Sequence, residues 1–162
     1  MDPDEHIQTH LVSVWREERK FLKRGTEGML FLTEKHLICI VKTEAKISWW
    51  DAATIKQIQM LRKSKNTMIH QEGYNDGDLR RDLKNDENEE VSFDNILRVD
   101  FEEKSWGNVM RLEINESGKA RKYQFSVVEG WVKYPLKDPI KFMKVGWAPF
   151  VNYIKSKQKV IG

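Results

Sequence analysis

Residues 97–127 read LRVDFEEKSWGNVMRLEINESGKARKYQFSV and carry the clearest structural signal in the chain. Apolar and polar side chains alternate in three successive segments, whose apolar members are Leu97, Val99 and Phe101, then Met110, Leu112 and Ile114, then Tyr123, Phe125 and Val127. This alternation predicts strands that each bury one face. The links SWGN (105–108) and NESGK (115–119) are short and contain glycine, so we expect hairpins and an antiparallel meander.

A further hairpin is predicted by residues 25–42, GTEGMLFLTEKHLICIVK. Its apolar runs MLFL and LICIV are separated only by residues 33–36, and both are too short for independent helices. The second run is rich in β-branched residues, which pack well on a pleated sheet. Both runs are therefore expected to be strands. Residues 11–22, LVSVWREERKFL, fit either an alternation or a helical stripe, and we favour a strand.

Two segments have the spacing of amphipathic helices. Residues 50–65 place three apolar side chains about one turn apart, namely Ile55, Ile58 and Leu61. Near the C-terminus the stripe consists of Trp147, Phe150, Val151 and Ile154. Because proline is tolerated only in the first turn of a helix, Pro149 predicts a start near Trp147 or Ala148, and the end is expected near Lys157.

The segment between the first helix and the meander has a different composition. Residues 66–90 are polar and acidic, and we expect a mobile loop with a short helical piece around 79–83. Residues 49–90 are thus interpreted as an insertion within a single domain that spans residues 1–162.

Composition and motifs limit the class of protein. No apolar run approaches the roughly 18 residues of a membrane span, and MDPDEHIQTH lacks the order of a signal peptide, so we expect a cytoplasmic protein, at most peripheral to a membrane. Cys39 is the only cysteine and is expected to be a core residue. The four histidines, the acidic stretch 75–90 and the glycines match no metal, phosphate-loop or nucleophile motif. We therefore expect no catalytic residues, no metal and no cofactor.

The order of these segments resembles the pleckstrin-homology-like (PH-like) superfamily, and within it the GRAM-like and prokaryotic PH-like domains. The resemblance covers roughly residues 10–48 and 91–158, and the residues that carry it are Gly28, Leu30, Leu32, Thr33, Leu37, Ser92, Ile96, Val99, Tyr123, Phe125 and the stretch Trp147 to Ile154. It implies a mainly β, α+β fold: a bent antiparallel barrel or sandwich, capped by the C-terminal helix. It also implies a non-catalytic module that binds lipid headgroups or peptides. The insertion is longer than usual for this superfamily, and the spaced basic signature of headgroup-binding members is absent between the first two strands.

Two binding hypotheses follow, and the first concerns charge. Residues 119–162 contain ten Lys or Arg and two acidic residues, a net charge of +8. If the chain brings them together, six of them are expected to attract anionic lipid headgroups or another polyanion, nucleic acid being the less favoured: Lys119, Arg121, Lys122, Lys137, Lys141 and Lys144. The alternative, about as probable from sequence alone, is an ordinary solvated face.

The second hypothesis, which we favour, is contact with a protein partner or a second copy of the chain. The chain has six tryptophans, and tryptophan is enriched at interaction hot spots although it is more often a core residue. Trp49 and Trp50 cannot both point inward if their segment is extended. We therefore expect a binding surface in the insertion, formed by Trp49, Trp50, Ile55, Ile58 and Leu61.

Overall fold

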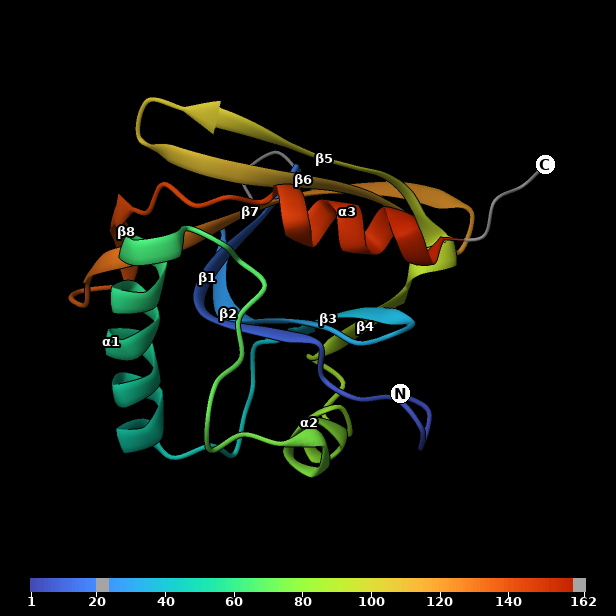
Figure 1. Ribbon diagram of the computed structural model, residues 1–162, viewed down its shortest axis with the longest axis horizontal. Coiled ribbons are helices and arrows are strands. Elements are labelled where there is room, and N and C mark those ends of the chain that lie inside the picture. The colour runs from blue at the N-terminus through green and yellow to red at the C-terminus, as the bar shows by residue number, and fades with distance from the viewer. Residues whose placement is uncertain (20–23, 159–162) are drawn as a thin grey trace.

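The computed structural model describes residues 1–19 and 24–158. Within these residues, seven antiparallel strands follow the order β4-β3-β2-β1-β7-β6-β5, and β8 pairs with β7 off this path (Figure 1). The strands are β1 (Thr9–Glu18), β2 (Thr26–Leu32), β3 (His36–Ile40), β4 (Glu89–Ser92), β5 (Ile96–Lys104), β6 (Gly107–Glu116), β7 (Lys119–Val132) and β8 (Asp138–Phe142). The helices are α1 (Ile47–Ser64), α2 (Asp76–Asp82), the 3-10 turn η1 (Phe93–Asn95) and α3 (Ala148–Lys157).

The sheet folds over on itself and remains open. In Figure 1 the strands β5, β6 and β7 form one layer, β2, β3 and β4 lie in the other, and α3 packs against β5. The two ends of the pairing order, β4 and β5, are not paired with each other in the part of the chain that is described. The fold is therefore the expected mainly β architecture with a C-terminal helix, in the form of an open sandwich and not of a closed barrel.

The change of direction between the layers lies in β1. Its pairing with β2 is interrupted between Leu11 and Val14, and β7 pairs with β1 only from Val14 onward. At this bulge Ser13 adopts a left-handed φ of 55°, and its hydroxyl donates to the carbonyl of Val128 at 2.9 Å. A bulge bends a strand and increases its twist, which lets one strand serve both layers. The predicted strand at 11–22 is confirmed as far as Glu18; its residues 20–22 lie outside the described part.

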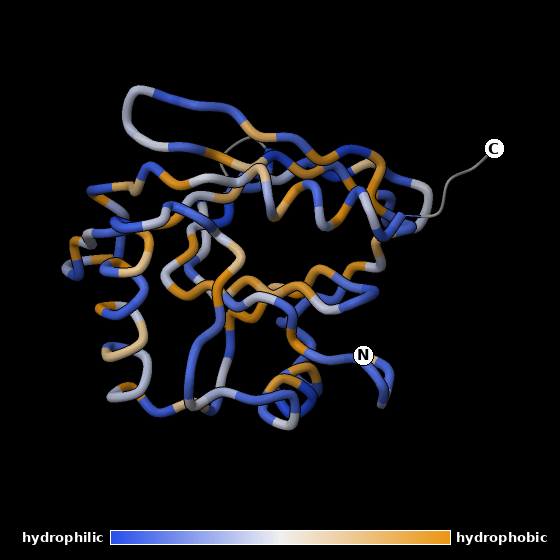
Figure 2. The backbone as a smooth tube through the Cα atoms, viewed as in Figure 1, coloured by the Kyte–Doolittle hydropathy of each residue, from blue (hydrophilic) through white to orange (hydrophobic). Residues whose placement is uncertain are grey.

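The larger core lies between the two layers, where Figure 2 shows hydrophobic residues facing one another. Alternate residues of β6 and β7 enter it, as the period of two predicts. The stripe of α3 closes this core with side chains that are at most 1% exposed, Trp147, Phe150, Val151 and Ile154. The C-terminal helix is confirmed, with Pro149 in its first turn.

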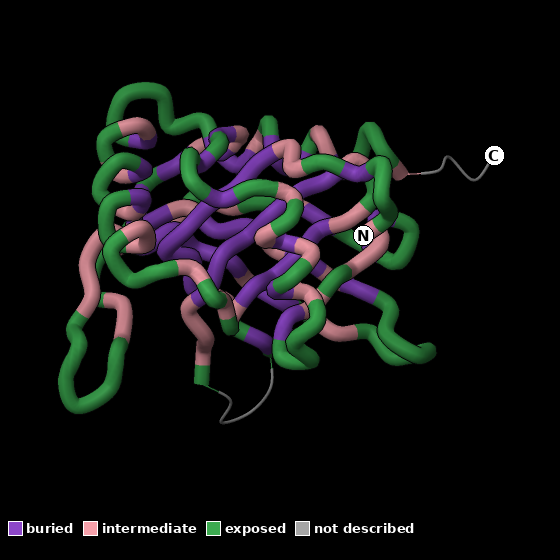
Figure 3. Tube along the Cα trace, turned by 90° about the horizontal axis from the view of Figure 1, so that it is seen from below, coloured by how far each residue is buried: buried purple, intermediate pink, exposed green. Residues whose placement is uncertain are grey.

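A second core lies on the other face of β2 and β3. There Phe31, Ile38 and Ile40 pack with residues of the insertion, among them Tyr74 and Leu79. Both faces of these two strands are thus covered, which explains why MLFL and LICIV are continuous apolar runs and not alternating ones. Figure 3 shows the result: the strands are largely buried, and exposed residues gather in the connections and on one side of the helices.

The insertion is an ordered part of the domain. The first predicted helix is present as α1, which begins at Ile47, before the expected residue 50. The expected mobile loop is instead held by hydrogen bonds: the amide of His10 donates to Ile69 at 2.8 Å, and Asn75 forms a capping box at the start of α2. Its final residues pair with β3 as strand β4. The acidic composition therefore reflects helix caps and bends and not a free loop.

One face of the meander differs from the prediction. Leu97 is 57% and Phe101 46% exposed, whereas Ile96 and Val99 enter the core. The register with β6 shifts between Ile96 and Arg98, and this irregularity moves Leu97 off the buried face. Phe101 lies further along the hairpin toward its exposed tip.

Candidate binding site

The six basic residues expected to bind anions do not come together. Lys119, Arg121 and Lys122 lie at the first end of β7, whereas Lys137, Lys141 and Lys144 follow its other end. At about 3.3 Å per residue, β7 extends over about 40 Å between its ends. The structure thus corrects the expectation of one basic surface, because a single long strand separates the two groups.

Three of the six are also neutralised by neighbours. Arg121 pairs with Glu18 at 2.8 Å and with Glu116, and these two hydrogen bonds raise the pKa of its guanidinium above the usual value. Lys137 pairs with Glu27 at 2.7 Å, and Lys141 with Glu129 at 2.8 Å. Lys119, Lys122 and Lys144 make no ion pair with any described residue.

Most of the residues expected to form a binding surface in the insertion are buried or partly buried. Its segment is helical and not extended, so Trp49 and Trp50 are both half-buried against the second core. The indole N–H of Trp49 donates to the carbonyl of Glu72 at 2.6 Å. Leu61 is fully buried and Ile58 partly so, which leaves Ile55, 61% exposed, as the only one of the five on the open surface.

A different apolar surface, which the sequence interpretation missed, lies on the β7–β8 hairpin. We call it the hairpin tip and define it by four exposed side chains: Val132 (41%), Tyr134 (87%), Leu136 (60%) and Ile140 (68%). In the sequence these residues alternate with lysines in VKYPLKDPIK, a signal that prolines obscure because they are unfavourable within strands. Figure 1 shows β8 at the side of the molecule, near the end of α1.

The base of the hairpin is anchored to β1. Trp131 donates its indole N–H to the Ser13 hydroxyl at 2.9 Å, and its ring lies 5.8 Å from that of Trp15. The ammonium of Lys137 lies 4.9 Å from the centre of the Trp131 ring. Beyond this base the tip carries no buried residue, so the apolar side chains there have no function in packing the domain.

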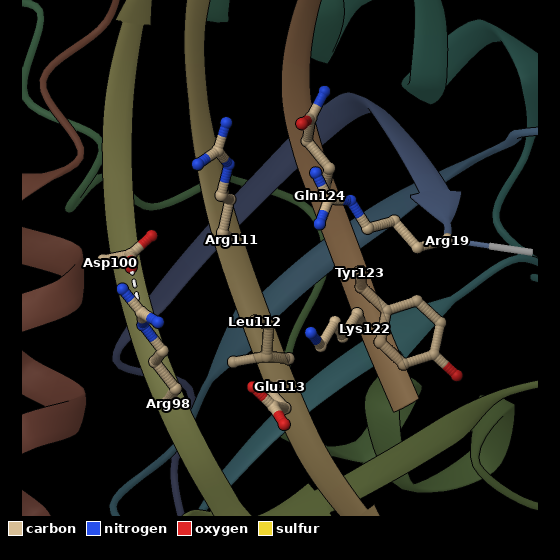
Figure 4. Close-up of a pocket in the computed structure, with 9 residues that line it drawn as sticks. All are labelled: Arg19, Arg98, Asp100, Arg111, Leu112, Glu113, Lys122, Tyr123 and Gln124. Carbon is tan, nitrogen blue, oxygen red and sulfur yellow. Dashed lines mark hydrogen bonds and ion pairs between the residues drawn. The ribbon is translucent and has the colours of Figure 1, made fainter. Parts of the chain in front are cut away.

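A shallow polar pocket of about 120 Å³ lies on the outer face of β5, β6 and β7 (Figure 4). Cross-strand pairing sets its residues in two rows, Arg98–Glu113–Lys122 and Asp100–Arg111–Gln124. Arg19 adds a fourth basic side chain, because its amide donates to the carbonyl of Lys122 at 2.9 Å. Only Lys122 among these residues was expected from sequence to bind an anion, since the rows depend on strand register.

Burial shifts the pKa values of two titratable side chains, His10 and Cys39. His10 is stacked on Phe31 at 4.0 Å, and burial, with a smaller effect of His70, lowers the pKa of its imidazole well below 6.5. Burial raises the pKa of the Cys39 thiol to about 11, which keeps it protonated. In residues 1–19 and 24–158, no three His, Cys, Asp or Glu side chains gather closely enough to hold a metal ion. No helix over the same ranges is long and apolar enough to cross a membrane.

Comparisons with known proteins give a structural likeness but no sequence match. No protein-family model matches the sequence, and a comparison with curated proteins finds no significant match. Among solved structures the chain is similar to a "Vps36 N-terminal PH domain", with 13% sequence identity, a TM-score of 0.48, and coverage of 97% of this chain and 81% of that chain. At this identity and TM-score the likeness says nothing about a ligand or a partner.

Proposed function

We infer that the chain is a non-catalytic, PH-like binding module that contacts a partner protein through the hairpin tip. The observation that carries this proposal is the set of four apolar side chains, 41–87% exposed, on the hairpin whose second strand, β8, lies outside the main pairing order of the sheet. An exposed apolar cluster on a domain of this size is unfavourable in water unless something covers it. Tyrosine, the most exposed member, is also enriched among residues that dominate binding energy.

The charges around the hairpin tip favour a protein over an anionic membrane. Two of the four lysines near the tip are in ion pairs: Lys137 pairs with Glu27 and Lys141 with Glu129. Arg62 also pairs with Glu129. An apolar centre surrounded by paired charges has the composition of a protein interface with a polar rim. Each lysine without an ion pair would contribute on the order of 1 kcal/mol to binding an anionic membrane. Near the tip these lysines are Lys133 and Lys144, which make no ion pair with a described residue.

The test is site-specific cross-linking in cells of the source organism. A photoreactive phenylalanine analogue replaces Tyr134, and the same analogue replaces Ile55 on α1 as a matched exposed site. We expect the analogue at position 134 to yield a defined adduct. The double variant Leu136→Ser, Ile140→Ser should lower the amount of this adduct about ten-fold or more, whereas the double variant Ile47→Ser, Ile55→Ser should leave that amount unchanged. The purified partner is then expected to bind the unmodified chain and to bind the Leu136→Ser, Ile140→Ser variant more weakly.

Three other results would redirect the proposal. Adducts formed from Ile55 and not from Tyr134 would place the interface on the insertion, as the tryptophans first suggested. Sedimentation of the purified chain with phosphatidylserine vesicles, lost with the Leu136→Ser, Ile140→Ser variant, would identify a membrane as the occupant of the hairpin tip. A dimer seen by light scattering that the same variant dissociates would identify a second copy of the chain.

A further inference from the structure

The outer face of β5, β6 and β7 holds a second feature, which is independent of the hairpin tip. The pocket drawn in Figure 4 is lined by Arg19, Arg98, Arg111 and Lys122 together with Asp100 and Glu113. Four cations against two carboxylates give the lining a net charge of +2, and Glu102, which pairs with Arg111, reduces it to +1. The positive excess lies in a concave part of the sheet surface and not on scattered side chains.

Ion pairs within the sheet account for some of these charges but not all of them. Arg98 pairs at 3.0 Å with Asp100, two residues along the same strand. Lys122 and Arg19, by contrast, make no ion pair with any residue in the described ranges. Arg19 directly follows β1 and Lys122 lies in β7, and the backbone hydrogen bond between Arg19 and Lys122 holds them at the same edge of the pocket.

A third donor in the pocket lacks a partner. The Nε–H of Arg111 is buried and has no acceptor among the described residues, although the same guanidinium pairs with Glu102. A buried donor without an acceptor is unfavourable, and in native proteins such a group commonly serves a ligand, an ion or a water molecule. Figure 4 shows the side chains of Arg111 and Gln124 extending from the neighbouring strands β6 and β7, and the side chain of Arg19, which follows β1, beside them.

We propose that this pocket binds a single phosphate monoester carried on a hydroxylated group. Guanidinium and ammonium groups recognise phosphate through charge-assisted hydrogen bonds. The carboxylates of Asp100 and Glu113 repel a polyphosphate but accept hydrogen bonds from hydroxyl groups of the carrier. Tyr123, the one aromatic residue in the lining, is only 5% exposed, so the pocket offers no ring for stacking a nucleobase.

The site differs from the one that the resemblance to PH-like domains would imply. Headgroup-binding members carry their basic signature between the first two strands, and this chain lacks it. The pocket is built on the opposite layer, from strand pairs β5–β6 and β6–β7. The phosphate monoester is common to a soluble phosphorylated metabolite and to a phosphorylated lipid headgroup, and the experiment separates these two sources.

The experiment is a titration of the ¹⁵N-labelled chain, followed by amide chemical shifts at constant ionic strength. The soluble probes are inorganic phosphate and glycerol phosphate, with chloride as the reference anion. The lipid probe is phosphatidylcholine vesicles containing phosphatidic acid, compared with vesicles of equal charge that contain phosphatidylserine. We expect saturable shifts at the amides of Arg19, Lys122 and Gln124 with phosphate, and none of this kind with chloride.

Matched variants make the result specific to the pocket. Lys122→Gln and Arg19→Gln are each expected to weaken phosphate binding about ten-fold. Lys119→Gln removes the same charge three residues away on β7, outside the pocket, and is expected to change affinity less than about two-fold. All three positions are exposed, and unchanged melting temperatures show that the variants are folded.

The possible results of these titrations lead to different conclusions. Saturation by glycerol phosphate supports the site with a soluble ligand, and binding to phosphatidic acid vesicles alone supports it with a lipid ligand. Equal effects of Lys119→Gln and Lys122→Gln would show general screening of charge and overturn the site. Absence of saturation with every probe would overturn it as well.

Discussion

The side chain of Gln57 satisfies the backbone at the bulge that bends β1. It is fully buried in α1, its Oε1 accepts from the amide of Val12 at 2.8 Å, and its Nε2 donates to the carbonyl of Val12 at 2.6 Å. Val12 lies inside the interruption of the β1–β2 pairing, so no strand residue supplies these two bonds. The side-chain Nε2 of Gln71 also donates to Gln57 Oε1 at 3.0 Å.

Replacing Gln57 by leucine should therefore destabilise the whole domain. Leucine has a similar volume, so the main change is the loss of partners for two buried backbone groups of Val12. Each such group costs about 1–3 kcal/mol when it is left unsatisfied, which gives an expected loss of about 2–6 kcal/mol. That is a large part of the roughly 5–15 kcal/mol by which small domains are stable.

The loss is measured by urea unfolding followed by circular dichroism. Gln59→Leu is the matched control, because Gln59 is exposed on the same helix and its loss should stay within about 0.5 kcal/mol. A change below about 1 kcal/mol for Gln57→Leu, with an unaltered denaturant slope, would refute the reasoning. It would mean that the bulge is supported by the strands alone and that α1 is not needed to satisfy it.

Three further predictions concern buried positions. Burial depresses the pKa of His10 below 6.5, so below about pH 6.5 the unfolded chain binds a proton that the folded chain does not. The free energy of unfolding should therefore fall by up to about 1.4 kcal/mol for each pH unit below about 6.5. Urea unfolding at several pH values should show this slope, and His10→Phe should reduce it. Cys39, whose pKa burial raises to about 11, should resist thiol reagents at neutral pH until urea unfolds the chain, and rapid labelling without urea would contradict its burial. Gly28→Ala should cost about 1–3 kcal/mol because the new Cβ would lie 2.7 Å from the Ile40 carbonyl oxygen, whereas Gly130→Ala, whose nearest contact is 3.4 Å, should be nearly neutral in thermal melts.

Much of the fold was predictable because local spacing determines it. The period of two in β6 and β7 holds, since each strand has one face in the core. The stripe and proline of α3 likewise located its beginning within one residue. The exposure of Leu97 was not predictable, because the register shift between Ile96 and Arg98 depends on pairing with β6 and leaves no mark in the sequence of β5 alone.

The candidate sites were harder to predict because they depend on distances between elements. The lysines of the C-terminal half looked like one group in sequence, but the length of β7 separates Lys122 from Lys137. The pocket residues Arg98, Arg111 and Lys122 looked unrelated, but strand register places them side by side. A charge count along the chain contains neither kind of information.

The insertion and the hairpin tip show why exposed and buried apolar residues must be distinguished before a function is assigned. Trp49 and Trp50 cover a face of β2 and β3 that would otherwise expose Phe31 and Ile38, so their packing is explained by stability alone. Tyr134 covers nothing: it is 87% exposed on a hairpin that contributes no buried residue beyond its base. Stability does not require an apolar side chain at that position, whereas the proposed contact with a partner would use it.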